Sequence, residues 1–344
     1  MTATNKNIII LGAGIAGLAC ATELHKMGCS LKVLEKSMGL GGRMATRRVQ
    51  NTWVDHGTQY FTAQQTQFRQ FVRQLVDLEI AQPWVTDIYS LQRGKLVPPS
   101  LDDRQTRYIC SQGMTSIAKY LARPLQEEKL ISTNVRINAA VATGNRWQLR
   151  SDQGEIFSAH IVVSTIPAPQ FLPIFSKPLA VNQAFIDTIA TVQFTPSLAV
   201  MAGYDPDQFV PESWYAVRCV DDPILSWVCL NSAKAGATDS SVFVIHSSIK
   251  YAHQSLDESN LELAGKPILS QMGKHFEKWL ETPLWWQVHR WRYAIVEEPL
   301  PVPYLLTTKP LPLICAGDWC GGFGLESAYM SGIATAQAVL ELLS

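Results

Sequence analysis

Residues 8–17 read IIILGAGIAG, and no other segment of the chain carries a stronger structural signal. The β-branched run Ile8–Leu11 predicts a buried strand, and the glycine turn Gly12–Gly17 follows it directly. Leu18–Met27 continues as a helix that Gly28 ends, and Leu31–Leu34 predicts a second strand. This order and spacing are typical of a βαβ unit of about 30 residues. The N-terminal segment therefore predicts a Rossmann-like α/β domain.

The glycine turn also matches the dinucleotide-binding pattern G-x-G-x-x-G. Gly12 permits the tight turn, Gly14 lets the backbone approach a pyrophosphate, and Gly17 allows a close approach of the helix. The N-terminus of the following helix offers N–H donors and a positive potential to that anion. Glu35 ends the second strand, where a carboxylate accepts hydrogen bonds from a ribose diol. The sequence therefore predicts dinucleotide binding.

Two further glycine-rich segments indicate more contacts with the same ligand. Gly41-Gly42 allows a second backbone approach, and Arg43 is placed to meet the pyrophosphate. Near the C-terminus a strand predicted over Ile314–Ala316 leads into Gly317-Asp318, and a helix follows from about Leu325 to Leu343. A carboxylate at this turn suits the hydroxyls of a ribityl chain, and the helix N-terminus suits a flavin oxygen or a phosphate.

The composition excludes several classes of function. A length of 344 residues favours about two domains, and the formal net charge of zero argues against nucleic acid or an anionic membrane as partner. No apolar run reaches the roughly 18 residues of a membrane span. The seven cysteines are scattered without metal-ligand spacing, and the histidines show none either. We therefore expect no metal site, reduced thiols and a cytoplasmic location.

The rest of the chain mixes helices and strands. An amphipathic helix is predicted over residues 64–80, short strands over 135–164, a strand over Val242–Ile245 and a helix over 257–280. The segments with recognisable chemistry lie at both ends of the chain. We therefore predict a discontinuous cofactor-binding domain and an inserted substrate domain. The first comprises residues 1–75, 105–170 and 286–344, and the second comprises residues 76–104 and 171–285.

Several motifs in combination resemble the renalase family of the amine-oxidase-like FAD superfamily. They are GGRMATRR at 41–48, DHGTQYFT at 55–62, HRWRYA at 289–294, GDW at 317–319 and LESA at 325–328. The resemblance implies non-covalently bound FAD. It also implies a p-hydroxybenzoate-hydroxylase-like topology with an inserted α+β substrate domain. Residues from about 170 to 280 match no motif of the family.

The resemblance assigns cofactor contacts at matching positions. Val135 corresponds to a backbone contact on the adenine side, and Asp318 to the ribityl contact. The full set of expected FAD-binding residues is Gly12, Gly14, Ile15, Ala16, Gly17, Glu35, Lys36, Gly42, Arg43, Gln59, Tyr60, Val135, Gly317, Asp318, Gly324 and Leu325.

Three residues are predicted to position the substrate. Tyr60 and Trp291 flank the cofactor motifs, and His246 follows an apolar strand in the predicted substrate domain. Arg290 and Arg292 either meet a substrate pyrophosphate or lie on a solvated strand face. The chain has one dinucleotide fingerprint, which argues against a separate NAD(P)H-binding domain.

Three classes of function stay open on the residues alone. The resemblance favours an oxidase of 2- or 6-dihydro isomers of NAD(P)H, in which hydride passes to FAD and oxygen is reduced to hydrogen peroxide. The second class is an amine oxidase or desaturase acting on another small molecule. The third is a flavin-binding module without catalysis. Fold alone does not choose among them, since one superfamily hosts many reactions.

Overall fold

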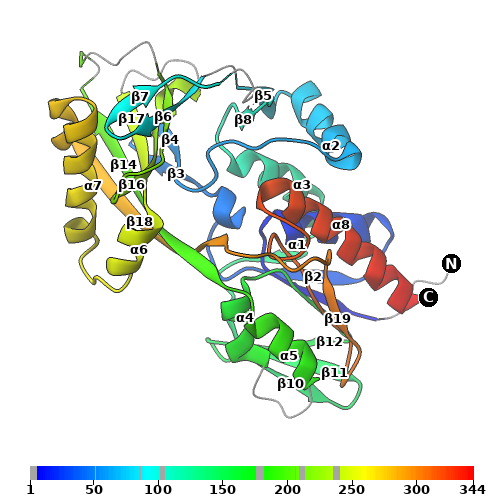
Figure 1. Cartoon of the computed structure of the whole chain (residues 1–344). Helices are drawn as coiled ribbons and strands as arrows, with labels where there is room; N and C mark the ends of the chain where they lie inside the picture. Colours follow the sequence, from blue (N-terminus) through cyan, green and yellow to red (C-terminus); the bar gives the residue numbers. More distant parts are fainter. Residues whose placement is uncertain are drawn as a thin grey trace.

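The computed structural model describes residues 6–50, 52–84, 87–100, 105–175, 182–205, 207–208, 214–234 and 241–344. Within these residues the chain forms two large sheets and a smaller antiparallel sheet, with helices packed around them (Figure 1). The predicted fold class, an α/β Rossmann-like unit with an inserted mixed α+β part, is confirmed.

The first large sheet has six strands and contains the predicted βαβ unit. Their order is β19 (Leu305–Thr307), β20 (Leu313–Cys315), β13 (Ile161–Ser164), β1 (Ile8–Leu11), β2 (Leu31–Leu34) and β9 (Ile131–Ser132). All neighbouring strands run parallel except β19, which is antiparallel to β20. The carboxyl ends of β1, β2, β13 and β20 therefore meet at one edge, which brings together the turns that follow them.

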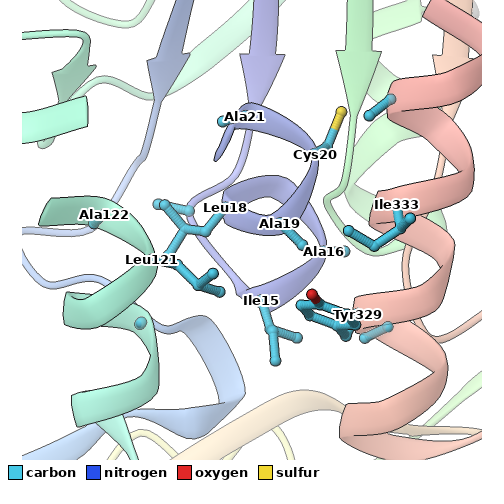
Figure 2. Close-up of a cluster of buried hydrophobic side chains, with 14 of the residues drawn as sticks. Ile15, Ala16, Leu18, Ala19, Cys20, Ala21, Leu121, Ala122, Tyr329 and Ile333 are labelled. Carbon is cyan, nitrogen blue, oxygen red and sulfur yellow. The ribbon is translucent and has the colours of Figure 1, made fainter. Parts of the chain in front are cut away.

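Helix α1 (Ile15–Lys26) lies between two other helices on one face of this sheet. Figure 2 shows α1 flanked by α3 (Thr115–Glu127), which carries Leu121, and α8 (Gly324–Leu343), which carries Tyr329. A Cβ added at Gly332 of α8 would lie 2.2 Å from the carbonyl oxygen of Ala16, so glycine permits this close helix contact. Because α1 is enclosed on several sides, nine of its twelve residues are buried rather than a single stripe.

The opposite face of the six-stranded sheet is covered by a smaller sheet and two helices. The antiparallel strands are β10 (Ile137–Thr143), β11 (Arg146–Ser151) and β12 (Ile156–Ala159), and the helices are α4 (Ala168–Phe175) and α5 (Gln183–Ala190). Ile9 and Leu11 of β1 pack into this second core, whereas Ile8 and Ile10 pack against the helical face. This alternation follows from the period of a strand.

The second large sheet has seven strands. Their order is β18 (Trp285–Val296), β14 (Phe194–Tyr204), β17 (Ser241–Ser247), β16 (Leu225–Leu230), β15 (Ala216–Cys219), β6 (Ile88–Gln92) and β7 (Lys95–Val97). Neighbours are antiparallel except β15 and β6. Helices α6 (Ile249–Gln254) and α7 (Leu261–His275) pack on this sheet (Figure 1).

The remaining elements connect these layers. They are the ribbon β3 (Thr46–Val49) with β4 (Thr52–Asp55), the ribbon β5 (Ala81–Pro83) with β8 (Tyr108–Cys110), helix α2 (Thr66–Asp77), and the 3-10 turns η1 (Gly42–Met44), η2 (Asn231–Lys234) and η3 (Lys278–Glu281).

Two predicted domain boundaries do not follow the packing. Strand β18 pairs with β14 along the seven-stranded sheet, so residues 286–296 group with the substrate side and not with the cofactor domain. Phe171, Phe175 and Phe185 pack into the core beneath the six-stranded sheet, so residues 171–175 and 182–190 group with the cofactor side. The division into two domains stays a prediction, with these boundaries moved.

Candidate functional site

A cavity of about 2220 Å³ opens between the two large sheets. Its cofactor side is lined by the turns after β1, β2 and β20 and by the start of α8. Its substrate side is lined by β3, β4, β14 to β18 and the loop at residues 56–60. Pockets for one small ligand have volumes of about 300–1,000 Å³. This cavity can therefore hold a dinucleotide together with a second molecule.

The glycine turn forms one wall of the cofactor side. Gly12 has a φ of +101°, which favours glycine. A Cβ at Gly17 would lie 2.0 Å from the carbonyl oxygen of Gly12, so this glycine allows the helix to start close to the turn and does not itself line the cavity. A Cβ at Gly14 would meet no atom within 4 Å, because Gly14 faces open space. This space fits the diphosphate that the motif predicts.

The Gly41–Arg43 segment lies against the same turn. The amide of Gly41 donates a hydrogen bond to the carbonyl of Ala13 at 2.9 Å, and a Cβ at Gly42 would lie 3.5 Å from the Cα of Gly14. Gly41 and Gly42 both have positive φ values, +102° and +54°. The structure therefore brings the two glycine-rich segments together at one end of α1.

Glu35 is held at the end of β2 by backbone donors. Its Oε2 accepts from the amide of Ala13 and its Oε1 from the amide of Ser37, both at 2.8 Å. Each carboxylate oxygen has a second lone pair, which leaves room for ribose hydroxyls. The amide of Val135 donates to the carbonyl of Glu35 at 2.9 Å, so an adenine contact at Val135 has to use its carbonyl oxygen. Lys36 also lines the cavity, and its Nζ donates to Gln170 at 3.0 Å.

Arg43 and Asp318 form a bidentate ion pair in the cavity wall. Nη1 and Nη2 of Arg43 each donate to one oxygen of Asp318 at 2.6 Å, and Nη1 also reaches the carbonyl of Ala294 at 3.2 Å. The sequence predicted separate contacts with a pyrophosphate and a ribityl chain, and the structure joins the two residues directly. Gly317, Gly324 and Leu325 line the cavity beside this pair.

The side chain of Gln59, which lines the cavity, belongs to a buried polar network. Its Nε2 donates to the carbonyl oxygens of Asp55 and Gly57, and its Oε1 accepts from Nζ of Lys234 at 2.8 Å. A cofactor contact at Gln59 can therefore be made only by its backbone or by the remaining lone pair of Oε1. Tyr60 follows it and lies beside Trp227, with ring centroids 5.7 Å apart.

A cluster of rings lines the substrate side. His56 stacks on Trp291 with centroids 5.3 Å apart, and His289 meets both rings edge-on at 4.7 and 4.3 Å. Nε1 of Trp291 donates to the carbonyl of His56 at 2.9 Å, which fixes the indole plane. His246 of β17 lies near the same loop. The cavity therefore brings together the predicted residues Tyr60, His246 and Trp291, and their roles in positioning substrate stay predictions.

The histidines of this cluster are neutral at physiological pH. Burial lowers the pKa of His56 to about 3, with His289 and Arg47 adding to the effect. Burial likewise lowers the pKa of His246 to about 4, with Lys234 adding, and that of His289 to about 4, with Arg47 adding. Nδ1 of His56 and Nε2 of His246 are buried and have no hydrogen-bond partner in the described part of the chain. Neutral imidazoles of this kind can bind polar groups but are weak proton acceptors.

Strand β18 contributes His289, a residue of the cavity that the sequence analysis did not single out. Alternation along a strand puts His289 and Trp291 on one face and Arg290 and Arg292 on the other. Nη1 and Nη2 of Arg290 donate to the carbonyls of Leu256 and Glu258, and Arg292 pairs with Asp257 at 3.0 Å. The alternation of side chains along residues 287–291 could have identified His289, because it puts His289 on the same face of the strand as Trp291. No local pattern marked His56.

The donor set of the cofactor side fits the predicted FAD. Open space beside Gly14 at the start of α1, an acidic residue at the end of β2 and a second acidic residue before α8 suit a diphosphate, a ribose and a ribityl chain, respectively.

We expect Asp318→Ala to weaken FAD binding by about 1.5–3 kcal/mol, because it removes charge-assisted hydrogen bonds and leaves Arg43 without its partner. Titration of the apoprotein with FAD measures the effect. Asp187→Ala, an exposed change on α5, is the control and should leave the affinity unchanged. Equal affinities of the two variants would show that Asp318 does not contact the cofactor.

Two family models match the chain. The NAD(P)-binding Rossmann-like domain matches residues 10–75, and the flavin containing amine oxidoreductase matches residues 100–340. Renalase from Mus musculus is 22% identical to this chain, and the alignment covers 98% of each protein.

Solved structures share the fold at low sequence identity. A putative protoporphyrinogen oxidase from Exiguobacterium has a TM-score of 0.73 at 14% identity, covering 98% of this chain and 100% of that one. Cyclohexylamine oxidase from Brevibacterium oxydans also has a TM-score of 0.73 at 14% identity, covering 98% and 99%. Among the described residues, no helix is both long and apolar enough to span a membrane.

Proposed function

Because this chain belongs to the family of flavin-containing amine oxidoreductases, whose model matches residues 100–340, we propose that it is a renalase-like FAD oxidase of dihydronicotinamide dinucleotides. The substrates are isomers of NAD(P)H that carry the extra hydrogen at ring carbon 2 or 6. The similarity to mouse renalase, which spans 98% of both chains, supports this choice over other members of the family.

The reaction is a two-electron oxidation. The isomer and one proton react with molecular oxygen to give NAD(P)⁺ and hydrogen peroxide, and the ring loses one hydride. FAD, when bound, would supply the two-electron acceptor for this chemistry. The residues of the protein then have to hold the donor ring in place and exclude water.

The observation that carries the proposal is the ring cluster of neutral imidazoles beside an indole. With pKa values of about 3 to 4, His56, His246 and His289 are poor general bases at neutral pH. Oxidation by hydride loss needs no proton acceptor on the substrate carbon. A flat dihydropyridine ring suits stacking beside Trp291, which lines the cavity.

The free thiols agree with the expected location. All seven cysteines are unpaired, and six of them are buried. Disulfides are rare in the cytoplasm because thiols are kept reduced there. The free thiols support the proposal that the protein is cytoplasmic.

We expect anaerobic mixing with 2- or 6-dihydro isomers to bleach the flavin absorbance much faster than mixing with ordinary β-NADH or with amines. Stopped-flow absorbance measures the rates, and aeration should then release hydrogen peroxide. Trp291→Ala should slow the bleaching while FAD stays bound, since its indole lies in the ring cluster and not among the predicted cofactor contacts.

Trp291→Phe serves as the matched variant, because it keeps a ring but loses the hydrogen bond to His56. We expect it to retain more of the rate than Trp291→Ala. Fastest bleaching by an amine would replace the proposed function with an amine oxidase, and bleaching by no donor would indicate a flavin-binding protein without catalysis.

A further inference from the structure

The cavity is strongly basic although the whole chain carries a formal net charge of zero. Among the described residues, ten lysine and arginine side chains line it, against two carboxylates, Glu35 and Asp318. Both carboxylates lie on the cofactor side, and Asp318 is already paired with Arg43. Among the described residues, every lysine, arginine, aspartate or glutamate that lines the substrate side is therefore a cation.

Five arginines contribute to the substrate side, and two of them bind backbone carbonyls or a carboxylate. Arg290 binds the carbonyls of Leu256 and Glu258, and Arg292 pairs with Asp257. The other three are Arg47, Arg48 and Arg218, for which no acidic partner occurs within the described ranges. Of these three, Arg48 and Arg218 are exposed, whereas Arg47 is partly buried.

Arg47 is held in place by neutral groups. It projects from β3, and its Nη1 donates to Oε1 of Gln287 at 3.2 Å while its Nη2 contacts Nδ1 of His289 at 3.3 Å. Burial lowers the pKa of Arg47, and the guanidinium in turn helps keep His289 neutral. A guanidinium has five N–H donors, so most of them stay available for a ligand. A positioned and partly desolvated cation without a counter-charge is suited to bind an anion.

We propose that Arg47 binds the diphosphate of the substrate, so that the enzyme selects anionic dinucleotides and rejects cationic amines. This inference rests on the proposed function. Arg47 touches His289, which in turn packs against Trp291 and His56. If the dihydronicotinamide ring of the substrate binds at this cluster, its diphosphate, which is joined to the ring through one ribose, would therefore lie near Arg47. An ammonium group would find no carboxylate among the described residues that line the substrate side.

The first test uses inorganic pyrophosphate and the FAD-loaded enzyme, in which the other diphosphate site is filled. We expect calorimetry to detect binding to the wild type, and Arg47→Gln to raise the dissociation constant about 10- to 100-fold. Arg47→Lys should restore part of the affinity through its charge. Arg292→Gln, which removes an arginine already paired with Asp257, is the matched control and should change little. Absence of binding to the wild type, or equal losses in Arg47→Gln and Arg292→Gln, would overturn the inference.

The second test compares two donors that differ only beyond the ribose. A dihydronicotinamide dinucleotide isomer carries the diphosphate, whereas the corresponding riboside lacks it. The wild type should bind the dinucleotide more tightly than the riboside. Arg47→Gln should remove most of this preference by raising the dissociation constant of the dinucleotide much more than that of the riboside. An unchanged preference would refute the role of Arg47 and leave the proposed function intact. If neither donor reduces the flavin, the proposed function fails, and the pyrophosphate titration still decides whether Arg47 binds anions.

Discussion

Replacing Gly14 by valine is expected to give a folded protein that retains no FAD. Gly14 has φ −76° and ψ 177°, a backbone conformation that valine adopts readily. Its Cβ position meets no protein atom within 4 Å. The two γ-methyl groups would therefore disturb little of the protein but would occupy the space that the diphosphate needs. We expect a loss of at least about 100-fold in affinity, which corresponds to about 2.7 kcal/mol.

The experiment separates binding from folding. The ratio of flavin to protein absorbance after gel filtration reports retention, and far-ultraviolet circular dichroism reports the fold. Met27→Val, at the exposed end of the same helix region, controls for adding a valine and should retain flavin fully. Gly17→Val should instead disrupt folding, because its Cβ would lie 2.0 Å from the carbonyl oxygen of Gly12. Stoichiometric flavin in Gly14→Val would exclude the glycine turn as the cofactor site.

The parts of the structure that follow from local patterns were predicted well. The first strand, the glycine turn and the second strand lie where the sequence placed them, and α8 begins one residue before the predicted start at Leu325. The predicted helix over 257–280 is α7, which begins after Asn260 because this side chain accepts from the amide of Glu262 at 3.0 Å.

Helix α4 forms in a segment that contains three prolines. The short strands predicted over 135–164 end before Pro167, Pro169 and Pro173, and residues 168–175 are helical. Pro169 lies in the first turn, where its missing N–H costs nothing, because the first N–H groups of a helix have no partner within the helix. Phe171 and Phe175 then bury the helix in the core beneath the six-stranded sheet, which compensates for Pro173.

The site itself depends on contacts between distant segments. Arg43 and Asp318 lie 275 positions apart and meet only because β20 and β1 belong to one parallel sheet. Arg47 of β3 likewise meets β18 at Gln287 and His289. Motifs could therefore predict that these segments bind a cofactor. They could not predict which side chains pair with each other and which remain available to a ligand.

Lys234 is the clearest residue that sequence reasoning overlooked. Its side chain is fully buried, and Nζ lies 3.7 Å from Oδ2 of Asp55 and 2.8 Å from Oε1 of Gln59. Oδ1 of Asp55 accepts from Thr46 at 2.7 Å and from the amide of Met114 at 2.9 Å. The ion pair therefore fastens η2 to the loop that carries His56 and Tyr60 at the cavity. Burial raises the pKa of Asp55, and the charge of Lys234 opposes that rise.

Removal of Lys234 should accordingly be among the most destabilising single changes in the protein. Lys234→Ala leaves a buried carboxylate without its counter-charge, which costs about 3–5 kcal/mol of unfolding free energy. Urea unfolding with FAD at a fixed excess measures the loss, and Lys278→Ala is the control, because that lysine forms an exposed pair with Glu281. The double variant Lys234→Met with Asp55→Asn should recover most of the stability, since it removes both charges.

The pH dependence identifies the buried charge as the cause. Without Lys234 the pKa of Asp55 rises further above its ordinary value of 3.8, so the native state binds a proton more readily than the unfolded chain. Lowering the pH through this raised pKa neutralises the carboxylate in the folded protein. The deficit of Lys234→Ala should therefore shrink towards acidic pH and be largest at neutral pH. A deficit that is equal at all pH values would instead assign the loss to packing, because a cavity left by the lysine stem does not titrate.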